Sequence, residues 1–267
     1  DLPDPSSLGD IDRAAERFVS AIINRESIAI FGDYDVDGAT SSALIQRYLN
    51  LLGQPVILYV PDRMTEGYGP NGPALAALAE RGARLVITVD CGTMAFIALA
   101  EGRHAGLDVI VVDHHLAEAT LPEAYAVVNP NRLDDTSGQG VLAAVGVAFL
   151  LLVAVNRALR TQGWFVQSGI LEPNLMKLLD LVALGTVCDV APLTGVNRAL
   201  VRQGLKVMAQ RLNPGLCALA EVAGNDTDPT VYHAGFIFGP RINAGGRVGK
   251  SDLGARLLAS HDLAEIT

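Results

Sequence analysis

Near the start of the chain, closely spaced acidic residues follow an apolar segment. Asp33, Asp35 and Asp37 alternate along the chain directly after residues 27–32, so that in an extended backbone their side chains project to the same side. Three carboxylates this close repel one another and raise each other's pKa values unless a cation neutralises them. Carboxylate oxygens are suitable ligands for Mg²⁺, Mn²⁺ or Ca²⁺. The spacing therefore predicts a metal-binding site.

Residues 33–38 also allow other interpretations. They match the first half of an EF-hand loop, but the twelfth loop position is Leu44, where a bidentate glutamate is required, and this excludes an EF-hand. Carboxylates after a strand also resemble those of the haloacid-dehalogenase phosphatases, which would make Asp33 or Asp35 a covalent nucleophile. A solvated acidic loop is the remaining alternative, and it is disfavoured because carboxylates rarely cluster against an apolar strand without a function.

Further residues that could carry chemistry follow two later segments rich in Ile and Val, and one apolar helical pattern. They are Asp90, Asp113, His114, His115 and Asp189. In an open sheet the carboxyl ends of parallel strands share one edge, where ligands bind. We therefore expect Asp35, Asp90 and His114 to lie close together, with Asp189 as a fourth contributor. Taken alone, an aspartate at such a position is more typical of a helix cap.

In the first half of the chain, short segments rich in Ile and Val alternate with helical patterns rich in Ala and Leu. The expected strands are 27–32, 56–60, 85–89, 109–112 and 124–128, and the expected helices are 39–52, 73–81 and 93–104. Near-continuous apolar runs are typical of buried parallel strands. Alternating strands and helices indicate a parallel sheet with helices on both faces. The sequence thus predicts an α/β fold: a doubly wound, mainly parallel sheet flanked by helices.

The second half is expected to be a mainly helical linking region. The expected helices are 141–159, 174–187, 197–211 and 251–260. The apolar run at 141–155 has fifteen residues, whereas spanning a bilayer takes about 20, so we expect a buried core helix and no membrane association. A boundary near 192–195 divides the chain into one domain at 1–195 and a linker at 196–267 that begins an incomplete second region.

The composition is that of a folded protein without a general nucleic-acid-binding coat. The chain has 267 residues, 50% of them apolar, a mean hydropathy of +0.31 and a net charge of −9, which excludes a disordered chain. An aromatic content of 5% and the negative charge leave only a local basic groove for nucleic acid. Three separated cysteines and an acidic start predict a reducing, cytoplasmic environment without a signal peptide. The absence of an initial Met predicts a fragment.

The motifs around these residues together resemble a known superfamily. They are DYDVDGAT at 33–40, VDCG at 89–92, VDHH at 112–115 and LGTVCDVAPL at 184–193. In this order they resemble the DHH phosphoesterases and, among these, the RecJ-type single-strand-specific DNA exonucleases. Four further segments are similar to that type: PDRMTEGYG at 61–69, VNPN at 128–131, GVAF at 146–149 and GPRINAGGR at 239–247.

The resemblance implies a two-metal site for Mn²⁺ or Mg²⁺ in residues 1–195, which would form the DHH-type catalytic domain. Its metal ligands would be Asp33, Asp35, Asp37, Asp90, His114 and Asp189. Asp90 would bridge both ions, Asp113 would orient the histidines, and His115 would face the scissile phosphate. Two such ions activate water and stabilise the leaving oxygen of an in-line displacement, so no covalent nucleophile is assigned.

The resemblance also implies substrate contacts outside the acidic cluster. They are Arg63 and Tyr68 in the 61–69 segment, and Arg241, Asn243 and Arg247 in the 239–247 segment. Arginine side chains and backbone amides near glycines suit phosphate groups. From the residues alone, a turn before a helix explains the second segment equally well, and an ordered loop with a surface arginine explains the first nearly as well.

The chain departs from the RecJ type in two respects. Phe31 stands where many members have histidine, so the first metal ion would lack a nitrogen ligand or would depend on Asp33 or water. A second substrate-binding domain with a Gly-Gly-His motif and an oligonucleotide-binding barrel are also missing from the sequence. Their absence fits the acidic balance and the low aromatic content.

The function implied is a metal-dependent phosphodiesterase that degrades single-stranded DNA from the 5′ end to mononucleotides in DNA repair and recombination. The implied partners are single-stranded DNA and a single-strand-binding protein or helicase. Two alternatives stay open. One is a DHH phosphoesterase for short oligonucleotides, cyclic dinucleotides or pyrophosphate, and the other is a non-catalytic nucleic-acid or replisome adaptor.

Overall fold

Five parallel strands form the centre of the protein, in the order β2-β1-β3-β4-β5. The computed structural model describes residues 2–248, 250–262 and 266. The strands are β1 (Ile28–Gly32), β2 (Val56–Tyr59), β3 (Leu85–Val89), β4 (Asp108–Val112) and β5 (Ala126–Val128). The strand order changes direction between β1 and β3, and in such sheets this switch opens a crevice at the carboxyl ends of the strands.

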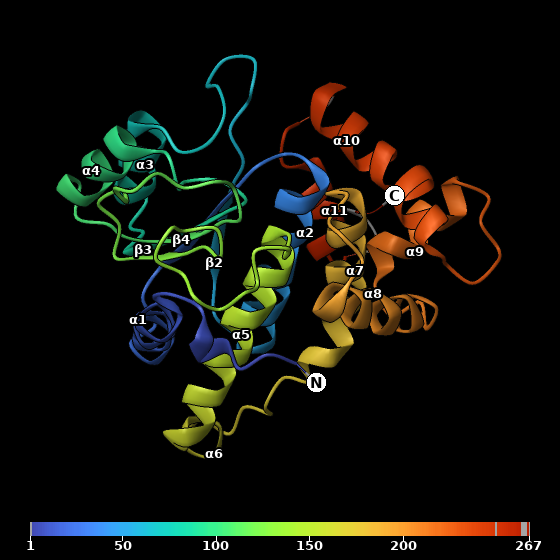
Figure 1. Ribbon diagram of the computed structural model, residues 1–267, viewed down its shortest axis with the longest axis horizontal. Coiled ribbons are helices and arrows are strands. Elements are labelled where there is room, and N and C mark those ends of the chain that lie inside the picture. Colours follow the sequence, from blue (N-terminus) through green and yellow to red (C-terminus); the bar gives the residue numbers. More distant parts are fainter. Residues whose placement is uncertain (1, 249, 263–265, 267) are drawn as a thin grey trace.

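Helices cover both faces of the sheet, as Figure 1 shows. The described helices are α1 (Ile11–Ile23), α2 (Val36–Leu51), α3 (Gly72–Glu80), α4 (Phe96–His104), α5 (Ala144–Thr161), α6 (Trp164–Ser168), α7 (Leu179–Cys188), α8 (Gly195–Met208), α9 (Pro214–Val222), α10 (Gly239–Val248) and α11 (Leu253–Ala259). Short 3₁₀ turns are η1 (Pro5–Ser7) and η2 (Leu175–Leu178), and η3 (His233–Phe238) is a π-helix that runs into α10. The predicted doubly wound α/β fold with a helical second half is confirmed.

The alternation of side chains along β1 divides the core into two clusters. Ile28 and Ile30 belong to the larger cluster with α1, α2 and α5, whereas Ala29 and Phe31 belong to a smaller one with α3 and α4. Successive residues of a strand point to opposite faces, and both faces of β1 are buried. This double burial explains why the strand is apolar throughout.

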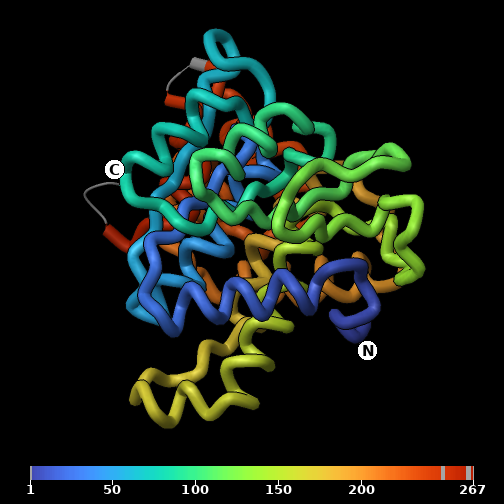
Figure 2. Tube along the Cα trace, turned by 90° about the vertical axis from the view of Figure 1, so that its left-hand side faces the viewer, coloured from blue at the N-terminus to red at the C-terminus, as the bar shows by residue number. Residues whose placement is uncertain are grey.

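Helix α5 contains the long apolar run. By length and composition it is the one helix of the described residues that could cross a membrane, and 72% of it is buried inside the fold. Its buried side chains include Phe149, Leu150 and Leu152 in the larger core cluster. The predicted core helix is therefore confirmed. Figure 2 shows the following segment around α6, in yellow, projecting from the body of the molecule.

The sequence patterns missed several helices. Helix α1 is strongly amphipathic, with Ile11, Phe18 and Ile22 buried on one side, and this spacing is the signal that would have revealed it. Helices α9, η3 and α10 were missed because α10 and the residues that flank α9 and η3 contain many Gly, Pro, Asn and Asp residues, which favour turns. The domain boundary near residue 195 stays a prediction. Helices from both sides of this position are in contact, since α8 packs on α7 and α11 packs on α2.

Candidate metal centre

The acidic loop after β1 is held by the first turn of α2. Asp35 caps this helix, with its Oδ1 accepting a hydrogen bond from the Gly38 amide at 3.0 Å. A Cβ on Gly38 would lie 2.4 Å from the Asp33 carbonyl oxygen, so only glycine allows the loop to close this tightly. The loop thereby points Asp33, Asp35 and Asp37 towards the crevice.

Asp90 lies directly after β3 in an uncommon backbone conformation. Its φ is 59°, a left-handed conformation that aspartate adopts more readily than most residues. The residue is 3% exposed, and its Oδ1 lies 3.3 Å from Nε2 of His114. The Tyr68 hydroxyl donates to the Asp90 carbonyl oxygen at 2.8 Å. The turn therefore aims the carboxylate into the centre of the constellation.

Asp37 is fixed by the amino end of α5, which lies on the other side of the crevice. Its two carboxylate oxygens accept hydrogen bonds from the amides of Ala144 at 2.7 Å and Val145 at 2.9 Å. Free amides and the helix dipole at a helix amino end stabilise a negative charge. Gly185 of α7 packs so close that a Cβ there would lie 3.2 Å from Asp37 Oδ1. Helices α5 and α7 thus enclose this carboxylate.

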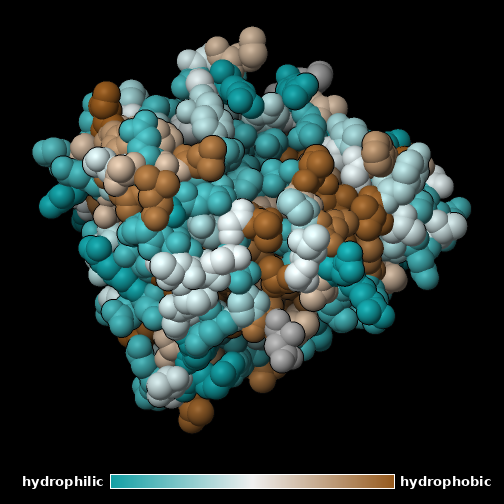
Figure 3. Space-filling model, viewed as in Figure 1, coloured by the Kyte–Doolittle hydropathy of each residue, from teal (hydrophilic) through white to brown (hydrophobic). Residues whose placement is uncertain are grey.

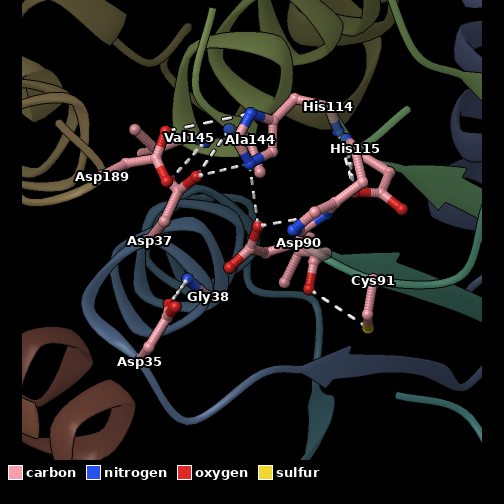
Figure 4. Close-up of polar contacts among 12 residues, drawn as sticks. Asp35, Asp37, Gly38, Asp90, Cys91, His114, His115, Ala144, Val145 and Asp189 are labelled. Carbon is pink, nitrogen blue, oxygen red and sulfur yellow. Dashed lines mark hydrogen bonds and ion pairs between the residues drawn. The ribbon is translucent and has the colours of Figure 1, made fainter. Parts of the chain in front are cut away.

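The predicted ligands converge in three groups that share members, and Figure 4 shows most of them pointing towards one another. In each group the donor atoms lie within 4.8 Å of one another. The groups are Asp33, Asp35 and Asp90; Asp37, His114 and Asp189; and Asp90, His114 and His115. Asp90 and His114 each belong to two groups, as expected of residues placed between adjacent ion positions.

Unsatisfied polar atoms show that this site suits a cation. Asp90 Oδ1 and His114 Nε2 are both buried, and neither has a hydrogen-bond partner among the described residues. Buried polar atoms are normally paired, and an unpaired carboxylate oxygen beside an imidazole nitrogen is the donor set that Mn²⁺ and related ions accept. The residues present therefore fit one or more divalent cations.

Electrostatics support the same conclusion. Burial, and then the charges of Asp37 and Asp35, raise the pKa of Asp90, while burial and then Asp189 raise the pKa of Asp37. Burial also raises the pKa of Asp189 and lowers that of His114. A bound cation opposes the shifts of the three carboxylates, because it favours their ionised form, and it acts in the same direction as burial on His114, because it favours neutral imidazole.

Asp113 anchors the two histidines and is not placed among the donor groups. Its Oδ1 accepts from the backbone amide of His114 at 2.8 Å and lies 2.7 Å from Nδ1 of His115. The Thr93 amide donates to its Oδ2 at 3.0 Å. Burial alone would raise the pKa of Asp113, but the hydrogen bond and charge of His115, with Thr93, hold it below its usual range. Asp113 therefore holds the His114 amide and the His115 ring in place, and its role in the reaction stays a prediction.

Two asparagines that were not predicted as site residues hold the histidine loop from behind. Asn129 donates to the His115 carbonyl oxygen at 2.8 Å and to Thr93 Oγ1 at 2.9 Å. Asn131 donates to the His114 carbonyl oxygen at 2.5 Å. They belong to the VNPN segment at the end of β5. The position of two asparagines at the end of a further parallel strand could have indicated that they lie near the site.

Arg63 and Tyr68 lie at the mouth of the site. The guanidinium carbon of Arg63 is 5.2 Å from the ring centre of Tyr34 and 5.4 Å from that of Tyr68, and cations over aromatic rings at such distances attract them. A cavity of about 300 Å³ is lined by Asp33, Asp35, Arg63, Tyr68, Asp90 and His115. The structure therefore places both predicted contact residues beside the acidic cluster.

The 239–247 segment is a helix, so the alternative of a turn at this position is wrong. Packing decided against local propensity: Gly246 is seated on Tyr34, where a Cβ would lie 2.8 Å from the ring. Arg247 lines a second cavity of about 310 Å³ with Tyr34 and Arg63. Asn243 Oδ1 is buried without a hydrogen-bond partner in the described chain. Arg241 is exposed and donates to the Ile237 carbonyl oxygen.

Phe31 is a core residue. It is fully buried and stacks on Tyr59 with ring centres 5.2 Å apart, in the cluster under α3 and α4. The side chain thus packs on the face opposite to α2 and α5, which bound the donor groups. The donor groups are formed without a side chain from this position.

Fold and site together define a doubly wound α/β protein with a carboxylate–histidine constellation, suited to divalent cations, at the carboxyl edge of its sheet. Residues 27–186 match the family described as "DHH family, N-terminal domain". Because this match covers more than half of the chain, the chain belongs to the DHH family.

Curated relatives extend over nearly the whole chain. It is 43% identical to the "Single-stranded-DNA-specific exonuclease RecJ" of Dickeya dadantii, over 99% of this chain and 46% of that protein. It is 42% identical to the protein of the same name in Escherichia coli, over 97% and 45%. The chain thus spans about half the length of the curated relatives it matches.

Solved structures agree with these relatives. The chain matches the "Crystal structure of exonuclease RecJ bound to manganese" with a TM-score of 0.84 and 37% identity, over 97% of this chain and 63% of that one. It matches the structure of RecJ from Thermus thermophilus in complex with Mn²⁺ with a TM-score of 0.79 and 35% identity, over 97% and 36%. The predicted resemblance to the RecJ type is confirmed.

Proposed function

We propose that this chain is a divalent-metal-dependent phosphodiesterase that degrades single-stranded DNA from its 5′ end to mononucleotides. The observation that carries the proposal is the sharing of Asp90 and His114 between adjacent donor groups, with a buried and unpaired atom on each. The names of the relatives, single-stranded-DNA-specific exonucleases, supply the substrate. Their greater length makes the activity of the whole protein a proposal for this chain.

The donor groups support a division of the ligands between two ions of Mn²⁺ or Mg²⁺. One ion would be held by Asp33, Asp35 and Asp90 and a second by Asp37, Asp90, His114 and Asp189, consistent with the Mn²⁺ and Mg²⁺ named in the titles of related structures. Bound there, such ions supply an activated water molecule and neutralise charge on the phosphate. The amides at the amino end of α5 orient Asp37, and Asp113 and Asn131 fix the loop of His114.

His115 serves the substrate side of the site. The hydrogen bond to Asp113, opposed by burial, raises the pKa of His115 and keeps a proton on Nδ1. The side chain is 50% exposed and lines the cavity beside Asp90. A protonated imidazole at this position would attract the scissile phosphate. Arg63, Tyr68 and Arg247 line the two adjoining cavities, and with Asn243 and Arg241 they would hold the strand.

The cellular setting follows from the substrate. Degradation of single strands belongs to DNA repair and recombination, which places the protein in the cytoplasm, where a single-strand-binding protein or a helicase would present the DNA. The chain carries a net charge of −9, so its own attraction for DNA is local and benefits from such helpers.

The test is hydrolysis by the purified chain with Mn²⁺ and with a chelator. The substrates are a long single strand labelled at either end, the matching duplex, and a dinucleotide. We expect mononucleotides from the 5′ end of the single strand, in Mn²⁺ only. Preference for the dinucleotide would establish the small-substrate phosphoesterase instead. A chain that binds no Mn²⁺ in calorimetry would be the adaptor, and a phospho-aspartate trapped at Asp33 or Asp35 would establish the dehalogenase type.

A further inference from the structure

Helix α8 carries a row of cations on its exposed face. Arg198, Arg202 and Lys206 are all exposed and are spaced four residues apart, so they lie on one side of the helix about 6 Å apart along its axis. The opposite side, which includes Leu200 and Val207, is buried in the core. The hydrophobic face thus fixes the helix, and the cationic face is presented to solvent.

The sequence around this row has a charge opposite to the rest of the chain. Between Asp189 and Glu221 there is no acidic residue. Residues 190–250 contain seven Lys and Arg against three Asp and Glu, a balance of +4, whereas residues 1–189 contain twelve against twenty-three, a balance of −11. The row therefore stands in the basic part of an otherwise acidic protein, and such asymmetry is typical of a surface that meets a polyanion.

The cations of the row are not used for ion pairs within the described part of the chain. Arg198 donates through Nε to the Leu193 carbonyl oxygen at 3.1 Å, and none of the three joins the ion pairs found among these residues. By contrast, Arg17 and Arg132 each bind two carboxylates. Unpaired arginine and lysine side chains keep their full capacity to neutralise phosphates.

The helix that carries the row follows the last predicted donor residue, Asp189, along the chain and packs against α7. Helices α7 and α8 pack closely, and at Gly204 a Cβ would lie 2.1 Å from the Leu179 carbonyl oxygen at the start of α7. At the amino end of α8, Asn197 donates to the carbonyl oxygens of Val141 and Pro192. Pro192 follows Asp189 by three residues. Figure 1 shows α8 beside α7, and Figure 3 shows hydrophilic side chains together with hydrophobic ones in this part of the surface.

We propose that the exposed face of α8 binds the sugar–phosphate backbone of a single strand whose end occupies the metal centre. This inference rests on the proposed function and adds a second contact region for the substrate. The helix carries no aromatic residue, so the contact is ionic and independent of base sequence, without base stacking. A row of point charges along a helix suits the repeating phosphates of a flexible strand.

The test compares two variants with the same loss of positive charge. The first is the triple variant Arg198→Gln, Arg202→Gln, Lys206→Gln. The matched control is Arg25→Gln, Arg81→Gln, Arg84→Gln, which removes three exposed cations near the amino ends of β1 and β3, at the opposite edge of the sheet. Affinity for labelled single strands of increasing length is measured by fluorescence anisotropy in a chelator, over a series of salt concentrations.

We expect the α8 variant to bind long strands about 100-fold more weakly than the control variant at 0.1 M salt, because each phosphate contact contributes about 0.7 to the salt slope for single strands. Its plot of log K against log salt is expected to be shallower by about 2. The deficit is expected to shrink as the strand is shortened. Thermal unfolding of both variants checks that the fold is retained.

Equal affinity and equal salt slopes for the α8 variant and the control would overturn the inference. The row would then bind an acidic protein or simply be solvated. This result is separate from a failure of the proposed function. If the proposed function failed, the unaltered chain would release no nucleotides in Mn²⁺. The comparison of strand binding in a chelator would still show whether α8 contributes to binding.

Discussion

Charge is handled differently at the carboxyl edge of the sheet and on the exposed face of α8. Asp37, Asp90 and Asp113 are at most 3% exposed, and each is fixed by amides, imidazoles or the unusual turn after β3. Arg198, Arg202 and Lys206 are exposed and joined to no carboxylate of the described chain. Buried charges are strongly coupled and destabilising when uncompensated, whereas exposed charges act weakly and nearly independently.

This difference indicates that the sheet edge and the α8 face contribute in different ways to the proposed function. Fixed, desolvated carboxylates define where a cation and a scissile phosphate meet, since electrostatic interactions are strong in such surroundings. Exposed cations add affinity in small increments that salt weakens. Changes at the sheet edge should therefore act on chemistry and on metal affinity, and changes on α8 on strand binding alone.

The largest effect is expected from Asp90→Asn. The variant keeps the shape of the side chain and tolerates the left-handed backbone, but it removes the carboxylate shared by two donor groups. Loss of several kcal/mol of charge stabilisation lowers Mn²⁺-dependent hydrolysis by about 10³-fold or more. Steady-state turnover on a single strand measures this, with circular dichroism to confirm folding. Undiminished turnover would contradict the assignment of Asp90.

His114→Ala is expected to act on metal affinity. Its imidazole lies 3.3 Å from Asp90 Oδ1 and 3.8 Å from Asp189 Oδ2. Removing it weakens Mn²⁺ binding ~10–100-fold if the effect is that of an outer-shell residue, and by more for a direct ligand. Isothermal titration with Mn²⁺ measures the change. The control is His104→Ala, an exposed histidine on α4; the same affinity in both variants would argue against a role in metal binding.

A smaller effect is expected from Asn131→Ala, which changes no donor group. The substitution removes the hydrogen bond to the His114 carbonyl oxygen and loosens the histidine loop, so that Mn²⁺ affinity falls about tenfold, at the lower end of outer-shell effects. Calorimetry compares it with Asn50→Ala, an exposed asparagine on α2. If Asn131→Ala binds Mn²⁺ as tightly as Asn50→Ala does, the loop does not depend on this contact.

The last prediction concerns the pH dependence of stability rather than activity or metal affinity. Burial, and then the charge of Asp35, raise the pKa of Asp33 from 3.8 to about 6. Between pH 4 and 6 the folded chain keeps this proton while the unfolded chain has lost it, so the free energy of unfolding falls as the pH rises, by about 3 kcal/mol at most. Asp33→Asn removes this fall. Urea unfolding in a chelator at several pH values measures it.

The control for that series is Asp228→Asn, an exposed carboxylate, which is expected to keep the pH dependence of the unaltered chain. A slope in Asp33→Asn equal to that of the control would mean that burial does not disfavour the Asp33 carboxylate. The charge of Asp33 would then behave like the exposed charges of α8, nearly independently of its surroundings.

Much of the sheet could be predicted from residue patterns. Residues 85–89 coincide with β3, and the other predicted strands differ from the observed ones by one or two residues at an end, because strands of a parallel sheet are nearly continuous apolar segments. The helix from 231 to 248 could not be predicted in the same way. Its glycines disfavour a helix locally, and only their close packing on Cys188 and Tyr34 makes them suitable.

The donor residues could be predicted to converge because they follow parallel strands, whose ends must meet at one edge. The groups that hold these donor residues in place could not be predicted. The capping of Asp37 by Ala144 and Val145 joins residues 107 and 108 positions apart. Backbone amides carry no sequence signature, and Asn129 and Asn131 look like ordinary turn residues in the sequence.

By itself, the sequence determined the strand pattern, the direction of the sheet and the identity of the groups at its carboxyl edge, since periodicity and residue chemistry are local properties. Only the tertiary structure decided which atoms of those groups remain unpaired, that Phe31 packs beneath α3 and α4, and that the cations of α8 are exposed on the side of the helix opposite to its buried face. These features depend on distances between segments far apart in the chain, which are set by how the helices pack.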